Sequence, residues 1–251
     1  MGMASLSTRR RKMLYELVVD TLRPGTCYQY LERLADAVAA RRKYGRLAGC
    51  WTSDDDTAYS GFGSLNQVVH IWSFEDMSRR QQSLSDLGAG NIWPPQAADI
   101  LVSQEVELLQ PAPFMKEMEA QARWSMYELA IDTVRQGTMK AVLQAWEKGL
   151  PDRIKHGPLA GCWVSATGKS DRVIHLWGCP GLRNRERIRN QSWKPGVWPP
   201  AREHIVTQEN RLLVPALFVE DSAYEVNLAG SLAATSPTYV PPPVAGKAPG
   251  L

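Results

Sequence analysis

The stretch that decides the fold is Leu14-Tyr15-Glu16-Leu17, which leads through Arg23 to Gly25-Thr26, because the chain contains it twice. It returns about 112 positions later as Met126-Tyr127-Glu128-Leu129, leading through Arg135 to Gly137-Thr138. Further matches follow in the same order along both copies: Leu47-Ala48-Gly49-Cys50-Trp51 with Leu159-Ala160-Gly161-Cys162-Trp163, Val69-His70-Ile71-Trp72 with Ile174-His175-Leu176-Trp177, and Trp93-Pro94-Pro95 with Trp198-Pro199-Pro200. A repeat of this length exceeds the roughly 20–50 residues of solenoid and propeller units, so each copy is expected to be a domain-sized unit.

Each copy has the pattern strand, helix, strand, strand, helix, strand. Residues 14–20 are rich in β-forming residues with apolar side chains on both faces, which indicates a strand buried on both sides. Apolar residues then recur at helical spacing between Cys27 and Val38. The other predicted elements are strands at 47–53 and 67–73, a helix from about 75, and a strand at 100–109, each with a counterpart in the second copy.

The order βαββαβ is that of the ferredoxin-like unit, whose four-stranded antiparallel sheet has both helices on one face. The other face needs a cover, and strands that are apolar on both sides indicate that the second copy supplies it. We therefore expect an α+β fold in which two fused ferredoxin-like βαββαβ repeats form a pseudo-dimeric α+β barrel. The expected organisation is a disordered basic tail at 1–12, a first repeat at 13–114, a linker at 115–124, a second repeat at 125–220 and a disordered Pro/Ala-rich tail at 229–251.

The composition argues against several classes of function. The formal net charge is only +3, with 29 Lys and Arg against 26 Asp and Glu, whereas nucleic-acid binding needs a concentrated basic face. No apolar run reaches the roughly 18–20 residues of a membrane span. No phosphate loop, dinucleotide fingerprint or zinc spacing occurs, so we expect no metal and no cofactor. Only Cys50 and Cys162 of the four cysteines are equivalent, so neither a disulfide framework nor a metal-ligand pattern is visible, and we expect a reducing compartment, the cytoplasm. Both residues precede a tryptophan in an apolar strand and are expected to be buried and inert. The basic run at 9–12 leaves a mitochondrial location as the alternative for a eukaryotic protein.

The repeated motifs resemble those of the NIPSNAP family over roughly residues 13–114 and 125–218. The resemblance rests on the Tyr-Glu-Leu opening with its Arg-x-Gly turn, the Gly-Cys-Trp segment and the Val-His-Ile-Trp strand. It implies membership of the dimeric α+β barrel superfamily, whose sister families include cofactor-free monooxygenases, haem proteins and small-molecule isomerases or lyases. Animal members of the family are linked to mitochondria and to vesicle or mitophagy biology. A shared fold does not assign a reaction.

The residues that could carry chemistry are those present in both copies. The first and third strands of a ferredoxin-like sheet are neighbours, so Glu16 and His70 are expected to form a cross-strand pair, as are Glu128 and His175. A carboxylate beside an imidazole raises its basicity, which makes a general base that works near neutral pH. The alternative is that each pair is a buried polar contact with no chemical role.

The same reasoning predicts a ligand pocket. Trp72 and Trp177 share a strand face with the histidines, and Trp51 and Trp163 lie at equivalent positions. Such a pocket would suit a small apolar or aromatic ligand with one polar handle, with core packing as the alternative. The equivalent arginines Arg80 and Arg185 can bind a carboxylate or phosphate, or belong to a solvated helix face. The two Trp-Pro-Pro elements are interpreted as the entry to a short helix or a turn, with a pocket lid as the alternative.

Two functions remain as hypotheses. The first is a cofactor-independent isomerase, lyase or oxygenase that binds its substrate inside the barrel and uses His70 or His175 as the base. The second is a non-catalytic binding or adaptor protein that presents the long loop 54–66 and the termini to a partner. Further homo-oligomerisation stays open. A ligand-sized cavity beside either histidine favours the enzyme, whereas a barrel filled with side chains favours the adaptor.

Overall fold

The structure is a computed structural model that describes residues 13–53, 64–115, 118, 124–192 and 198–216. The predicted tails at 1–12 and 229–251, most of the predicted linker at 115–124 and most of the loop 54–66 lie outside the described residues. The first repeat consists of β1 (Leu14–Leu22), α1 (Cys27–Arg41), β2 (Arg46–Thr52), β3 (Gln67–Phe74), α2 (Met77–Ala89) and β4 (Leu101–Pro111). The second consists of β5 (Met126–Val134), α3 (Met139–Arg153), β6 (Leu159–Ser165), β7 (Arg172–Cys179), α4 (Leu182–Ser192), the 3-10 turn η1 (Arg202–His204) and β8 (Ile205–Pro215).

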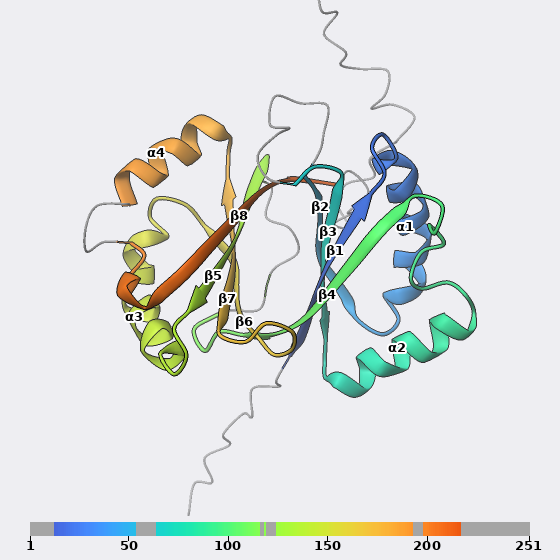
Figure 1. Cartoon of the computed structure of the whole chain (residues 1–251), viewed down its shortest axis with the longest axis horizontal. Coiled ribbons are helices and arrows are strands. Elements are labelled where there is room, and N and C mark those ends of the chain that lie inside the picture. The colour runs from blue at the N-terminus through green and yellow to red at the C-terminus, as the bar shows by residue number, and fades with distance from the viewer. Residues whose placement is uncertain (1–12, 54–63, 116–117, 119–123, 193–197, 217–251) are drawn as a thin grey trace, which may run out of the picture. The chain divides into compact units, whose positions relative to one another are not determined.

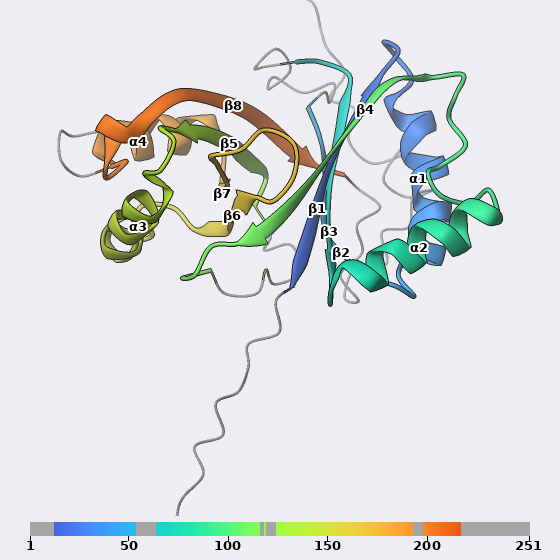
Figure 2. The same ribbon diagram turned by 60° about the horizontal axis from the view of Figure 1, so that its bottom comes forward.

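The eight strands form one closed barrel in the order β1-β3-β2-β8-β5-β7-β6-β4. Within each repeat the strands have the ferredoxin-like order, with β4 beside β1 and β8 beside β5. The repeats are joined by antiparallel pairing of β2 with β8 and of β4 with β6. Figure 2 shows how β4 and β8 each cross from their own repeat to the other one. The predicted pseudo-dimeric α+β barrel is confirmed.

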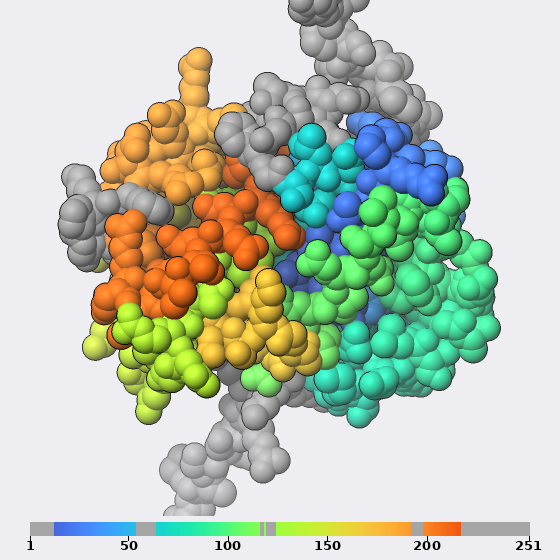
Figure 3. Space-filling model, in the orientation of Figure 1, coloured from blue at the N-terminus to red at the C-terminus, as the bar shows by residue number. Residues whose placement is uncertain are grey.

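The helices cover the outside of the barrel. In Figure 1, α1 and α2 lie on the outer side of the first repeat's strands, and α3 and α4 lie on the outer side of the second repeat's strands. In the space-filling view, atoms of β8 and of the turn between β6 and β7 lie against first-repeat atoms along the junction (Figure 3). None of the helices in the described part of the chain is long and apolar enough to span a lipid bilayer.

Aromatic side chains from both repeats pack in the barrel interior. Trp51 and Trp163 are both fully buried. The ring centroid of Trp163 lies 5.5 Å from that of Tyr15, and the centroid of Trp51 lies 5.4 Å from that of Tyr127. The indole of Trp163 also covers Gly161, where an added Cβ atom would come within 2.1 Å of the ring. The Gly-Cys-Trp motif is therefore a packing device, because only glycine leaves room for the indole two residues later.

The two faces of each strand meet different surroundings. Tyr15, Leu17 and Val19 of β1 belong to the core cluster that contains Trp51 and Trp163. The intervening residues point to the other face, beneath the helices, where Glu16 contacts an arginine of α1 and Asp20 contacts a tyrosine of α1.

The histidines lie on the outer faces as well. Val18 is the partner of His70 in the β1–β3 register, and Ala130 is the partner of His175 in the β5–β7 register. The expectation that the histidines and their neighbouring tryptophans line a chamber inside the barrel is therefore wrong. They lie between sheet and helices.

A candidate functional site on the outer face of the second repeat

Each repeat contains a hydrogen-bonded chain of aspartate, histidine and tryptophan on its outer face. In the second repeat His175 Nε2 lies 3.2 Å from Asp132 Oδ2, and the indole Nε1–H of Trp177 donates to His175 Nδ1 at 2.7 Å. The side-chain amide of Gln208 donates to the other oxygen of Asp132 at 2.9 Å. The first repeat has the same chain in Asp20, His70 and Trp72, with Gln104 in place of Gln208.

This chain fixes the tautomer of the histidine. An indole N–H can only donate, so Nδ1 of His175 accepts and the neutral ring carries its proton on Nε2, which then donates to Asp132. Both ring nitrogens are thus engaged, and the same holds for His70. A histidine that accepts a proton from a substrate would first have to break one of these bonds, so the geometry does not supply the base that the sequence predicted.

The predicted pairing of each histidine with a glutamate is wrong. The strand register places Glu16 opposite Trp72 rather than His70, and Glu128 opposite Trp177. Glu16 instead accepts hydrogen bonds from Arg41 of α1, at 2.6 Å, and from Arg80 of α2.

Glu128 is bound by arginines too. It accepts two hydrogen bonds from Arg185 of α4, at 2.9 and 3.0 Å. Arg80 and Arg185, predicted to hold a ligand, are therefore engaged with glutamates of their own repeats. Neither glutamate therefore supports a histidine as the sequence predicted, because both form ion pairs with arginines of their own repeats.

The outer face of the first repeat is filled by its own side chains. The hydroxyl of Tyr30 in α1 donates to Asp20 Oδ2 at 2.5 Å. The guanidinium of Arg41 lies 4.6 Å from the ring centroid of Trp72 and 4.0 Å from that of Trp93. Arg41, His70 and Trp72 are fully buried, so solvent does not reach this group.

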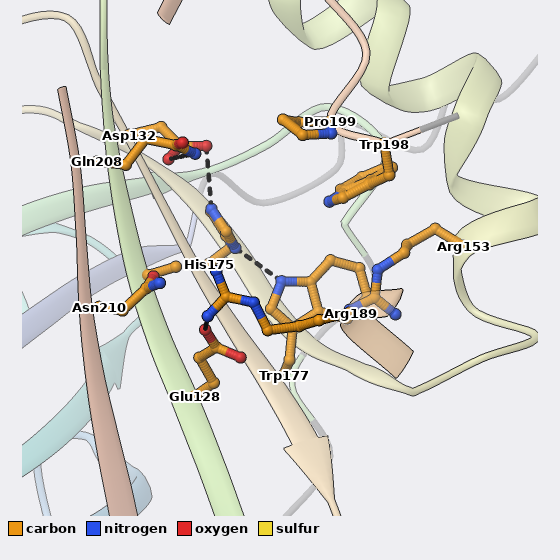
Figure 4. A pocket seen from close by; sticks show the side chains of 11 residues that line it. Glu128, Asp132, Arg153, His175, Trp177, Arg189, Trp198, Pro199, Gln208 and Asn210 are labelled. Atoms are coloured by element: carbon orange, nitrogen blue, oxygen red, sulfur yellow. Dashed lines mark hydrogen bonds and ion pairs between the residues drawn. The ribbon is translucent and has the colours of Figure 1, made fainter. Parts of the chain in front are cut away.

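The second repeat has a cleft at the same place. Its volume is about 50 Å³, several times the roughly 10–15 Å³ that one water molecule needs on the same measure. Figure 4 shows the side chains that surround it, with Trp198 and Pro199 on one side and Glu128, Asn210 and Asp132 on the other. The lining residues are Glu128, Ala130, Asp132, Arg153, His175, Trp177, Arg189, Trp198, Pro199, Gln208 and Asn210.

Three substitutions between the repeats lie at the wall of the cleft in the second repeat. Ala130 stands where the first repeat has Val18, and Asn210 stands where it has Val106; the strand registers pair Val18 with Val106 and Ala130 with Asn210. On α4, Arg189 occupies the position of Leu84 on α2, since both lie four residues after the equivalent arginines Arg185 and Arg80. Each change removes apolar volume or adds a polar group at the wall of the cleft.

A further difference lies on the first helix of each repeat. Val142 of α3 stands where α1 has Tyr30, so Asp132 has no counterpart of the tyrosine hydroxyl bond at that position. Trp146 replaces Leu34 and packs on His175, with 4.8 Å between ring centroids. In the second repeat Trp146 therefore packs against the histidine, while Asp132 accepts no hydrogen bond from the position that corresponds to Tyr30.

Arg153 differs from its first-repeat equivalent in that it does not pair with the glutamate of its own repeat. Its equivalent Arg41 is bound to Glu16, but Glu128 is occupied by Arg185, and Arg153 makes no ion pair with a carboxylate among the described residues. Its guanidinium lies 3.9 Å from the ring centroid of Trp177, and its Nε–H has no hydrogen-bond partner there. Burial lowers the pKa of Arg153 to about 10, so it stays protonated at neutral pH.

The chain is similar to known proteins in both sequence and fold. The NIPSNAP family model matches residues 15–116 and residues 127–220, once for each repeat. The chain belongs to the NIPSNAP family. Human NipSnap homolog 3B is 26% identical over 214 residues, which cover 81% of this chain and 84% of that protein. Mouse NipSnap homolog 2 is 24% identical over 223 residues, covering 84% and 76%.

Solved structures similar to this NIPSNAP chain share its barrel. A candidate monooxygenase from Lactobacillus acidophilus superposes with a TM-score of 0.56 at 12% identity, covering 81% of this chain and 93% of that one. An anthrone oxidase-like protein superposes with a TM-score of 0.58 at 10% identity, covering 82% and 92%. At these identities the likeness establishes the fold alone.

Sequence reasoning missed several residues of the cleft in this NIPSNAP protein. Asp20 and Asp132 are present in both copies, as are Arg41 and Arg153, so the repeat that identified the histidines also carried a signal for them. The sequence predicts a turn at Trp198 and Pro199, with a pocket lid as the alternative, and in the structure both residues line the cleft. Asn210 carried no such signal, because it differs between the copies.

Proposed function

We propose that this NIPSNAP protein binds a small molecule in the outer cleft of its second repeat, and that the first repeat is a closed copy that completes the barrel. The difference between the repeats carries this proposal. The same Asp-His-Trp chain is covered by Tyr30 and Arg41 in the first repeat and borders an open cleft in the second.

The walls of the cleft suit an amphipathic ligand. Trp177 and Trp198 provide aromatic surface, with their ring centroids 5.6 Å apart and nearly perpendicular. Asp132 and Asn210 provide hydrogen-bonding groups opposite them. Ligand sites are commonly built in this way, from apolar walls with a few polar groups that fix orientation. The proposal keeps the predicted apolar or aromatic ligand and moves it from the barrel interior to the outer face.

The geometry favours binding over proton transfer by histidine. Both ring nitrogens of His175 hold hydrogen bonds within the protein, so the ring orients Asp132. In the first repeat Oδ2 of Asp20 accepts a hydrogen bond from the hydroxyl of Tyr30. The equivalent oxygen in the second repeat, Oδ2 of Asp132, would accept a hydrogen bond from a donor on the ligand.

The proposal is tested by filling the cleft with the side chains of the first repeat. Ligand-observed NMR on the full-length protein, with a mixture of small aromatic and aliphatic acids and their amides, identifies compounds that bind. The double variant Ala130→Val, Asn210→Val places in the second repeat the valines that the first repeat has at the equivalent positions 18 and 106. It should abolish the NMR binding signals of those compounds. The control is Thr207→Val, an exposed position on the opposite side of β8, which should leave them unchanged. Binding that survives in the double variant would place the ligand elsewhere and refute the proposal.

A further inference from the structure

The charges on the outer face differ between the repeats. In the first repeat two carboxylates, Glu16 and Asp20, face two guanidiniums, Arg41 and Arg80, so the formal charges cancel. In the second repeat the equivalents of all four are present, and Arg189 adds a third guanidinium. With His175 neutral, the second group carries one positive charge in excess of its carboxylates.

This excess charge is located at the cleft. Glu128 Oε1 accepts from Arg185 at 2.9 Å and lies 3.5 Å from Arg189, so two cations already surround this carboxylate. Arg153 is the equivalent of Arg41, which binds the glutamate of the first repeat, but its guanidinium lies over the ring of Trp177 instead. Its Nη1 makes only a long contact of 3.5 Å with the carbonyl oxygen of Gly157. A partly buried guanidinium without a carboxylate partner is unfavourable, and an incoming anion would offset that cost.

We propose that the ligand of this cleft carries a compact anionic group, a carboxylate, which binds between Arg153 and Arg189. This inference rests on the proposed function of the cleft. The side chains of both arginines line it, one from the end of α3 and the other from α4 (Figure 4). The planar guanidinium fork matches a carboxylate, and charge-assisted hydrogen bonds of this kind are roughly twice as strong as neutral ones.

The size of the cleft limits what enters it. A volume of about 50 Å³ accepts a carboxylate and the atoms next to it, whereas whole drug-sized ligands occupy pockets of about 300–1,000 Å³. The remainder of the ligand would therefore lie at the mouth, against Trp198 and Pro199. Arg189 is the residue that confers selectivity for an anion, because the first repeat has Leu84 at its position.

The test uses benzoate and benzamide, which have nearly the same shape and differ in charge. Isothermal titration of the full-length protein should give a dissociation constant for benzoate at least tenfold lower than for benzamide. Arg189→Gln should bring the two constants within about twofold of each other by weakening benzoate alone. Arg187→Gln, an exposed position on the same helix, should keep the full preference, and thermal melting of each variant checks that it is folded.

The outcomes separate the two proposals. If both compounds bind equally and both are lost in Ala130→Val, Asn210→Val, the cleft is a binding site and the inference of an anionic ligand is wrong. If benzoate binds with the same affinity in that double variant, the site lies elsewhere and both proposals fail. If benzoate does not bind at concentrations that reveal millimolar affinity, the carboxylate inference is overturned, while other compounds in the NMR mixture still decide the function of the cleft.

Discussion

The hydroxyl of Tyr30 should contribute measurably to stability through its bond to Asp20. That bond is 2.5 Å long, is fully enclosed by protein, and ends on a carboxylate that also accepts from His70 and Gln104. A hydrogen bond to a charged group contributes about 1.5–3 kcal/mol. Tyr30→Phe removes only the hydroxyl and should lower the free energy of unfolding by that amount, which corresponds to roughly 3–12 °C in melting temperature for a chain of this size.

Urea denaturation at pH 7 measures this loss. Tyr28→Phe is the matched control, since Tyr28 lies on the same helix and its side chain is 62% exposed; its effect should stay within about 0.5 kcal/mol. Benzoate affinity should not change in Tyr30→Phe, because the first repeat is closed. If Tyr30→Phe were as stable as the control, the reasoning that this hydroxyl takes the place of a ligand donor would be refuted.

The loss should also depend on pH. Burial opposes the ionisation of Asp20, but the hydrogen bonds that it accepts from His70, Tyr30 and Gln104 hold its pKa below the ordinary value of 3.8. A carboxyl whose pKa is lowered by folding stabilises the native state above its unfolded pKa, and this contribution disappears as the pH falls through the folded pKa. The difference between wild type and Tyr30→Phe should therefore be full at pH 7 and shrink below about pH 3.8.

Three further outcomes follow from the packing and the charges. Gly161→Ala places a Cβ atom 2.1 Å from the ring of Trp163 and should cost about 1–3 kcal/mol or more by urea denaturation. Gly149→Ala is its control, because the nearest atom there is 3.4 Å away and the site is helical, so it should be neutral or stabilising by about 0.5–1 kcal/mol. Glu128→Gln removes the carboxylate that competes for Arg189 and should tighten benzoate binding about three- to tenfold in titration calorimetry; the exposed Glu186→Gln should not, and unchanged affinity in the former would contradict the charge argument. A thiol reagent at pH 8 should modify Cys27 rapidly and the other three cysteines only after unfolding, because burial raises the pKa of Cys50 and Cys162 strongly and that of Cys179 to about 11; rapid loss of a second thiol would contradict it.

The elements of the fold were predictable because their signals are local. Apolar residues at helical spacing predicted a helix from Cys27, and α1 runs from Cys27 to Arg41. The strand predicted at 67–73 is β3, Gln67–Phe74. The barrel followed from one further step, since a sheet that is apolar on both faces needs two covers and the second copy was available to provide one.

The site was only partly predictable, because its partners depend on register. Strand alternation predicts that Glu16 shares a face with His70. Asp20 lies four residues after Glu16 and so on the same face, and alternation does not decide which of the two carboxylates lies beside the histidine, since a shift of two residues keeps the same face. The folded register pairs Val18 with His70 and leaves the ring to bond Asp20, while the arginines of α1 and α2 take Glu16. Glu16 and His70 do lie on the same face of neighbouring strands, but each bonds a residue other than the one predicted.

The sequence alone determined that this protein is two equivalent halves of one barrel, because the repeated order of motifs is visible without any knowledge of contacts. Only the tertiary structure decided that the tryptophans of the Gly-Cys-Trp motifs fill the interior, that the histidines lie outside it, and that one repeat is closed while the other is open. The reason is physical. The cleft is the space that side chains from α3, α4, β5, β7 and β8 leave unfilled. These residues are far apart in the sequence, so whether they fill the space is decided only when folding brings them into contact.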